Sequence, residues 1–256
     1  MLCHIADGVA TITLNRPDRM NAWTYEMEVA YFDLVDALDD DTSVRAVVLT
    51  GAGRGFCPGL DASVLADRTQ GITGAEGVER PMTHALTLRK PLIAAINGGC
   101  AGIGLIQALV ADIRFAAAGA KLATAFTRRG LVAEFGASWM LPRLVGVGNA
   151  MDLLLSGRAI TAEEATAMGL VNRVLPGDEL LTTAQAYAAD LATNCSPLAM
   201  QAVKAQVAAD WSREIDASIE EAALLVKEPA RRPDFREGVA SYAERRGPNF
   251  APLPPR

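Results

Sequence analysis

The 256-residue sequence predicts an α/β fold that ends in a helical appendage. Stretches typical of strands and of helices alternate as far as residue 175, and helical patterns dominate after that point. Two of the strand-like stretches, residues 45–63 and 90–105, run into glycine-rich turns. Glycine permits positive φ and lets the backbone come close to a ligand. The two turns are therefore candidate halves of one site.

The first predicted strand covers residues 8–14, and Asn21 is a candidate N-cap for the helix that follows. Residues 45–50 predict the next strand, which leads into the first glycine turn. Residues 64–80 predict a mobile loop over a site, because they are polar, contain glycine and show no clear period. The apolar stripe of the helix after Asn21 has helical spacing and consists of Met27, Ala30, Tyr31, Leu34 and Leu38.

The middle of the chain predicts a short helix that ends near Arg89 and a strand over residues 92–96. The second glycine turn then opens a helix over residues 104–111. Further strands are expected over residues 112–117 and 121–125.

Helical patterns follow Glu134, with one short strand over residues 170–175. Thr161 stands three residues before Glu164, which is the spacing of a capping box. Ser196 precedes a proline, as a cap precedes proline at the first helical position. The last two helices are expected near residues 213–226 and 233–246.

Composition excludes several classes of protein. The net charge of −6 argues against general affinity for nucleic acids. No apolar run is long enough for a membrane span, and the chain enters a strand pattern without a signal or transit peptide. The four cysteines form no CxxC pair, so a structural zinc site is not expected. A reduced chain in the cytoplasm is the expectation that follows.

The glycine turns do not match the common nucleotide motifs. The first turn, GAGRG, follows a strand, but Pro58 interrupts the helix that a dinucleotide fingerprint requires. Neither a P-loop nor a G-x-S-x-G elbow occurs. Bare N–H groups at such turns can hold a developing oxyanion. The pattern therefore favours an enzyme that stabilises an enolate or a tetrahedral intermediate.

Several segments in order resemble the crotonase superfamily, the enoyl-CoA hydratase/isomerase family. The resemblance covers nearly the whole chain. It rests on DGVATITLNRPDRMNA, GAGRGFCPGLDAS, RKPLIAAINGGCAGIGLIQALVADIRFA, GLVAEFGASWMLPRLVG, GRAITAEEATAMGLVNRV and the final SYAERRGPNF.

The resemblance implies a crotonase-like spiral of ββα units in residues 1–195, which carries an acyl-CoA site. It also implies a C-terminal helical oligomerisation region in residues 196–256 and a homotrimer or a dimer of trimers. The implied substrate is an acyl-CoA thioester, so coenzyme A enters as part of the substrate. No permanently bound cofactor and no metal are expected.

The same resemblance implies the site residues. The backbone N–H groups of Leu60 and Ile103 form the oxyanion hole, with Gly102 beside it. Arg19 lies near the CoA phosphates, although a solvated surface arginine explains it equally well. The segment from Leu60 through Asp61, Ala62 and Ser63 lines the pantetheine and adenine of CoA, largely through its backbone.

The catalytic carboxylates depart from the family pattern. Hydratases of the family carry two glutamates, and the matching positions here are Ile106 and Phe126. Glu134 is the remaining carboxylate in a matching place, and isomerases of the family use one there. It can also be a charge that stabilises a helix N-terminus. Ile106, Phe126 and Trp139 are expected to form the apolar surroundings of Glu134, or simply part of the core.

A single carboxylate suffices for a 1,3 proton shift, so the favoured activity is that of a Δ3-Δ2 enoyl-CoA isomerase. The alternative is an enoyl-CoA hydratase that uses Glu134 as its only acid/base. A second alternative is a non-catalytic acyl-CoA-binding subunit.

Overall fold

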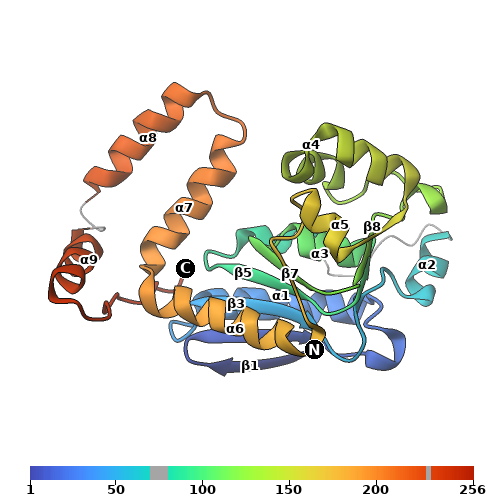
Figure 1. The fold of residues 1–256 in the computed structure, drawn as a ribbon, viewed down its shortest axis with the longest axis horizontal. Coiled ribbons are helices and arrows are strands. Elements are labelled where there is room, and N and C mark those ends of the chain that lie inside the picture. The colour runs from blue at the N-terminus through green and yellow to red at the C-terminus, as the bar shows by residue number, and fades with distance from the viewer. Residues whose placement is uncertain (70–79, 229–231) are drawn as a thin grey trace.

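A computed structural model of the chain describes residues 1–69, 80–228 and 232–256 and has the expected α/β architecture (Figure 1). Its larger sheet has six strands in the order β1-β2-β3-β5-β7-β10. All neighbouring strands in it are parallel except the β1–β2 pair. The strands are β1 (Leu2–Ala6), β2 (Val9–Leu14), β3 (Ala46–Gly51), β5 (Leu92–Ile96), β7 (Ile113–Ala117) and β10 (Arg173–Leu175).

A second, four-stranded sheet has the order β4-β6-β8-β9. The strands β4 (Gly55–Cys57), β6 (Gly99–Ala101) and β8 (Lys121–Ala123) are parallel, and β9 (Ala159–Thr161) is antiparallel to β8. Three successive ββα units contribute to both sheets, and each unit gives its first strand to the larger sheet and its second to the smaller. Their helices are α2 (Ala62–Thr69), α3 (Ile103–Leu109) and α4 (Ala137–Ser156). The spiral of ββα units is thereby confirmed.

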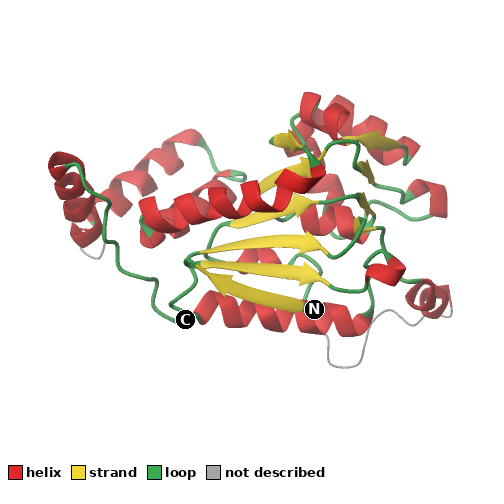
Figure 2. Cartoon of the chain, turned by 60° about the horizontal axis from the view of Figure 1, so that its bottom comes forward, coloured by secondary structure: helices red, strands yellow, loops and turns green. Residues whose placement is uncertain are grey.

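The core lies around the larger sheet. Every residue of β3 and β5 is buried, which is expected when helices cover both faces of a parallel sheet. Helix α6 (Gly177–Asn194) crosses one face, as Figure 2 shows, and α1 (Tyr25–Asp40) packs into the core on the other side. The buried residues of α1 are Met27, Tyr31, Phe32, Val35, Leu38 and Asp39. Ala30, expected in this stripe, is exposed.

Two local predictions about the first half of the chain are wrong. The N-cap of α1 is Thr24, whose hydroxyl accepts a hydrogen bond from the Met27 N–H at 3.2 Å, and not Asn21. Residues 62–69 form α2, which contradicts the loop expected from residue 64 onward, and residues 70–79 of that expectation lie outside the described part of the chain. The segment before Arg89 contains a short 3-10 helix over His84–Thr87.

Both predicted caps in the second half are confirmed. The Thr161 hydroxyl accepts a bond from the Glu164 N–H at 3.2 Å and caps α5 (Ala162–Ala167). The Ser196 hydroxyl accepts one from the Ala199 N–H at 3.0 Å and caps α7 (Pro197–Asp210). In the described residues, no helix is long and apolar enough to cross a membrane.

The last helices extend away from the sheets as an arm, which consists of α7 (Pro197–Asp210), α8 (Ile215–Lys227) and α9 (Arg232–Glu244) (Figure 1). Large apolar side chains are exposed along it. They are Val203, Val207, Trp211, Ile215, Ile219, Leu224, Val226, Phe235, Val239 and Tyr242. Exposed apolar surface of this extent is typical of a region that contacts a partner.

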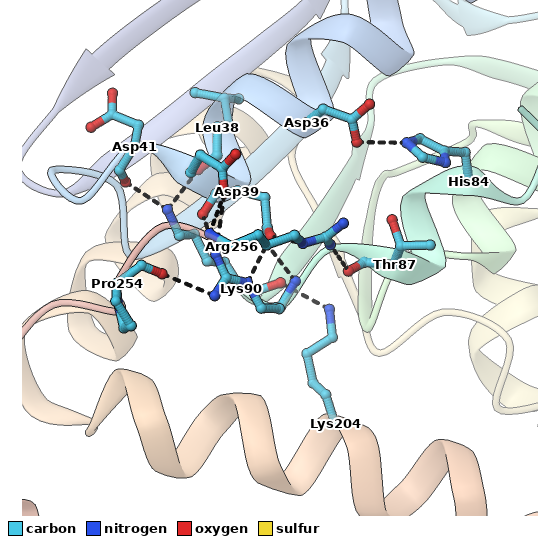
Figure 3. A network of polar contacts seen from close by, with 12 residues as sticks. Asp36, Leu38, Asp39, Asp41, His84, Thr87, Lys90, Lys204, Pro254 and Arg256 are labelled. Atoms are coloured by element: carbon cyan, nitrogen blue, oxygen red, sulfur yellow. Dashed lines mark hydrogen bonds and ion pairs between the residues drawn. The ribbon is translucent and has the colours of Figure 1, made fainter. Parts of the chain in front are cut away.

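A polar network ties the arm to the core (Figure 3). Lys90 is fully buried, and its ammonium donates to the carbonyl oxygens of Leu38 and Asp41, both at 2.6 Å, at the C-terminal end of α1. Lys204 of α7 donates to the Lys90 carbonyl at 2.8 Å and pairs with Asp112 at 2.7 Å. Burial lowers the pKa of Lys90, while Asp39 and Asp41 act against that change.

The buried carboxylate of Asp39 forms the second half of this network. Its Oδ2 pairs with Arg89 Nε and with Arg256 Nε, both at 2.7 Å. The Arg89 guanidinium also donates to the Pro254 carbonyl at 2.9 Å. The tail of the chain is therefore fixed beside the end of α1.

Candidate active site

One pocket lies at the carboxyl ends of three neighbouring parallel strands. The strands β4, β6 and β8 each run directly into residues that line it, which is the usual position of a ligand site on parallel sheets. Leu60, Gly102, Ile103 and Glu134 all line this pocket, although they come from separate loops. The full lining is Pro58, Gly59, Leu60, Leu65, Gly102, Ile103, Thr124, Ala125, Phe126, Arg129, Glu134 and Phe135.

The two glycine turns lie against each other at this pocket. A Cβ added to Gly102 would lie 3.8 Å from the Cα of Gly59, so the two backbones are in contact distance. Gly59 has φ +122° and Gly102 has φ +51°, values that side chains of other residues rarely allow. Both turns therefore depend on glycine for their conformation.

The backbone N–H groups of Leu60 and Ile103 differ from those of neighbouring residues in their hydrogen bonding. Around Leu60, the Trp23 N–H donates to the Gly59 carbonyl at 2.9 Å and the Asp61 N–H donates to the Trp23 carbonyl at 2.8 Å. Ile103 is the first residue of α3, and its N–H has no acceptor within the helix. Among the described residues, neither the Leu60 nor the Ile103 N–H has a hydrogen-bond acceptor. Two donors at one pocket are suited to an oxyanion.

Two asparagines hold the first glycine turn in place. The Asn21 amide donates to the Gly55 carbonyl at 2.8 Å and to the Ala52 carbonyl at 3.0 Å. Asn97 donates to the Gly53 carbonyl at 2.9 Å and accepts from the Gly51 N–H at 3.0 Å. Asn21 has φ +64°, a conformation that asparagine tolerates better than most residues. No local pattern in the sequence indicates these long-range partners.

Both carboxylate oxygens of Asp61 have partners, one within its own loop and one outside it. Its Oδ1 accepts bonds from the Ser63 N–H at 3.1 Å and the Ser63 hydroxyl at 3.0 Å, and its Oδ2 pairs with Arg16 at 3.0 Å. The Ser63 backbone bond, together with Arg16, holds the pKa of Asp61 below its ordinary value. Ala62 and Ser63 are exposed at the start of α2.

Arg19 is exposed at the end of the 3-10 helix Pro17–Arg19 and does not line the pocket. Arg16, which the sequence did not single out, is the arginine that contacts the first turn. It also donates to the Ala22 carbonyl at 2.6 Å.

Glu134 is half-buried in the turn before α4, beside Phe135 with φ +53°. Ala125, two residues after the end of β8, has φ +60°. Non-glycine residues in this left-handed region are uncommon and concentrate at functional sites, where surrounding structure holds them. Two of them therefore border the same pocket as Glu134.

The apolar residues expected around Glu134 separate into two groups. Phe126 is buried and lines the pocket, and Ile106 is fully buried within α3. Trp139 is 43% exposed, and its ring centroid lies 4.7 Å from that of Trp211 at the end of α7. Trp139 was thus wrongly placed, because it faces the arm instead of the pocket.

Thiol chemistry is not indicated at this site. Cys57 ends β4 next to the pocket, but burial raises its pKa to about 12. A buried, protonated thiol is a poor nucleophile. In the described residues, no group of three or more His, Cys, Asp or Glu side chains could hold a metal ion.

The ββα spiral and the pocket at the ends of its strands are the architecture that the resemblance in sequence implies. The chain belongs to the enoyl-CoA hydratase/isomerase family, whose family model matches residues 4–252.

Two relatives and one solved structure illustrate the similarity. The chain is 36% identical to 1,2-epoxyphenylacetyl-CoA isomerase of Escherichia coli K12, over 98% of this chain and 97% of that protein. It is 40% identical to a probable enoyl-CoA hydratase of Rhodobacter capsulatus, over 96% and 95%. The crystal structure of a probable enoyl-CoA hydratase/isomerase from Mycobacterium abscessus superposes with a TM-score of 0.90 at 33% identity, and 98% of each chain is covered.

Proposed function

We propose that the protein is a Δ3-Δ2 enoyl-CoA isomerase in which Glu134 is the only acid/base. The observation that carries this proposal is the composition of the pocket. Glu134 is the one carboxylate among its described lining residues, and it shares the pocket with the N–H groups of Leu60 and Ile103.

In this mechanism the thioester carbonyl oxygen accepts hydrogen bonds from the Leu60 and Ile103 N–H groups. The Glu134 carboxylate takes a proton from C2, and the electron pair of that C–H bond moves toward the carbonyl to give a dienolate. The protonated Glu134 then returns the proton to C4, so that the double bond moves from C3–C4 to C2–C3. Each backbone donor can contribute about 3–4 kcal/mol to stabilising the dienolate.

The pocket gives hydration less support. Hydration of a 2-enoyl thioester needs a base to activate water and an acid to protonate carbon. Ile106 and Phe126 occupy the positions of the two family glutamates and can do neither. Hydration would therefore rest on Glu134 alone.

The names of relatives do not decide between the reactions. The relative from Escherichia coli is an isomerase, whereas the one from Rhodobacter capsulatus is a probable hydratase. The third candidate, a non-catalytic acyl-CoA-binding subunit, predicts saturable binding of thioesters without turnover.

The remaining parts of the proposal concern coenzyme A and assembly. The backbone of residues 60–63 is proposed to line the pantetheine and adenine, and Arg19 to lie near the phosphates. Residues 196–256 are proposed to form the oligomerisation region of a trimer or a dimer of trimers. A cytoplasmic location agrees with four free cysteines.

The test compares 3-enoyl-CoA and 2-enoyl-CoA thioesters as substrates for wild type and Glu134→Gln. Glutamine keeps the size of the side chain but cannot accept the proton, so kcat should fall at least about 100-fold with little change in thioester affinity. Deuterium exchange at C2 of a bound saturated acyl-CoA should also stop. The exposed Glu179→Gln, on α6, is the matched control.

Two results would contradict the proposal. Near-normal isomerisation by Glu134→Gln would make Glu134 a helix-end charge. The base would then be sought among Asp67, Glu76 and Glu79, the last two of which lie outside the described residues. Rapid hydration of 2-enoyl-CoA by wild type, without any shift of a 3-enoyl double bond, would replace the isomerase by a hydratase.

A further inference from the structure

The pocket contains a second charged side chain that the proposed reaction does not use. Besides Glu134, Arg129 is the only charged residue among the described lining residues. It ends the 3-10 helix Thr127–Arg129, and its N–H donates to the Phe126 carbonyl at 2.9 Å. This short helix places the Arg129 side chain at the pocket, beside the end of β8.

The adjacent Arg128 does not lie at the pocket and serves as a comparison for Arg129. Arg128 Nε donates to the Ser156 carbonyl at 2.8 Å, at the C-terminal end of α4. Unpaired carbonyls and the helix dipole at such an end favour a cation. Arg128 thus stabilises the fold, whereas Arg129 faces the substrate pocket.

The Arg129 guanidinium is largely unused by the protein. Its Nη1 donates to the Ala125 carbonyl at 3.3 Å, which is long for such a bond. It forms no ion pair with any carboxylate in the described part of the chain. A guanidinium has five donors in a planar fork that matches a carboxylate. Its remaining donors are therefore available to a ligand.

The position of Arg129 indicates which part of the substrate it meets. The reacting atoms of a thioester must lie between the two backbone donors and Glu134, which line the same pocket. Arg129 is an exposed residue of the pocket lining and follows β8, whereas the turn proposed to hold the pantetheine follows β4, on the other side of β6. A group that reaches Arg129 is therefore assigned to the acyl chain, and a guanidinium that this group covers needs an anionic partner.

Building on the proposed function, we propose that Arg129 binds a carboxylate at the far end of the acyl chain. The preferred substrates are then enoyl-CoA thioesters whose acyl chain ends in a carboxylate, in preference to those with a plain alkyl end. The fork of Arg129 binds that carboxylate through paired, charge-assisted hydrogen bonds.

The test measures binding of unreactive thioesters by calorimetry, so that it does not depend on turnover. Hexanoyl-CoA is compared with adipoyl-CoA, and octanoyl-CoA with suberoyl-CoA, because each pair differs only at the chain end. The proteins are wild type, Arg129→Met, Arg129→Lys and the control Arg128→Met. Thermal melts check that each variant folds.

Wild type should bind the carboxylated member of at least one pair more tightly. Arg129→Met should weaken that binding about 10–100-fold and leave the alkyl member nearly unchanged. Arg129→Lys, which keeps the charge but not the fork, should lie between, and Arg128→Met should match wild type. If Arg129→Met lost affinity equally for both members of a pair, Arg129 would be assigned to the CoA portion. If it lost affinity for neither, the role of Arg129 would be limited to its hydrogen bond with the Ala125 carbonyl. Either result overturns the proposal.

Turnover of the corresponding 3-enoyl thioesters separates this inference from the proposed reaction. A binding preference without isomerisation would refute the isomerase and leave the carboxylate site standing. Isomerisation without a preference for the carboxylated chain would support the isomerase and refute the carboxylate site.

Discussion

Gly102 is a single residue on which the proposed oxyanion hole depends. Its φ of +51° and ψ of −120° set the direction of the adjacent Ile103 N–H. A Cβ at this position would meet no atom closer than 3.8 Å, so a side chain fits in space but not in conformation. The consequence of substitution should therefore be local.

Gly102→Val is expected to lower kcat about 100-fold or more while the protein remains folded, because it misdirects one donor. Gly119→Val is the control, since Gly119 has φ +74° and open space around it but lies away from the pocket. Steady-state kinetics and circular dichroism measure the two effects. Wild-type rates in a folded Gly102→Val protein would show that this turn is not the hole.

The role of a residue was predictable from the sequence where it depends on local backbone conformation alone. Glycine at 59 and 102 signals a special φ in the sequence itself, and the resemblance supplied Glu134. Asn21 and Trp139 were misplaced because their partners are far away in the chain, in the first glycine turn and at the end of α7. No local pattern encodes such contacts.

At the scale of elements, Trp211 connects the arm to the loop that carries Glu134. Trp139 lies in the first turn of α4, three residues after Gly136, and packs on Trp211. The guanidinium of Arg143 stands 4.2 Å from the centre of the Trp139 ring. The end of α7 therefore supports the start of α4.

Trp211→Ala is expected to lower the free energy of unfolding by about 1–2 kcal/mol, the scale of one partly exposed aromatic contact. It should also reduce kcat several-fold, because the loop before α4 loses support. Trp211→Phe should restore most of both. Denaturant unfolding and steady-state kinetics are the measurements, and unchanged kcat in Trp211→Ala would separate the arm from the site.

Most strands of the larger sheet were predictable, whereas β1 of that sheet and β4 and β6 of the smaller sheet were not. Long apolar runs such as residues 92–96 indicate buried strands directly. The strands β4 and β6 have three residues each and lie inside the glycine-rich segments, where strand patterns are absent. Their pairing arises from the spiral and not from local preference. The caps at Thr161 and Ser196 were predictable because capping is local.

The whole molecule presents the arm as an unpartnered surface. Ile219 on α8 is 59% exposed, and the apolar side chains around it need a partner. We expect a trimer or a dimer of trimers by light scattering at micromolar concentration. Ile219→Glu should shift the protein toward smaller species, because a charge buried in an apolar interface is costly.

Glu220→Gln, one residue away on the same helix, is the matched control and should leave the assembly unchanged. A wild-type protein that stays monomeric would refute the expected assembly. A wild-type oligomer that Ile219→Glu does not disturb would place the interface elsewhere on the chain.

The network around Asp39 also bears on when the chain can finish folding. Arg256 pairs with Asp39, and its N–H donates to Asp40 across 216 residues of sequence. The ribosome synthesises Arg256 long after α1. The Asp39 carboxylate therefore lacks one of its two cations during most of translation. Contacts of such separation form late and slow the search for the native state. The docking of Arg256 at the end of α1 is therefore expected among the late steps of folding.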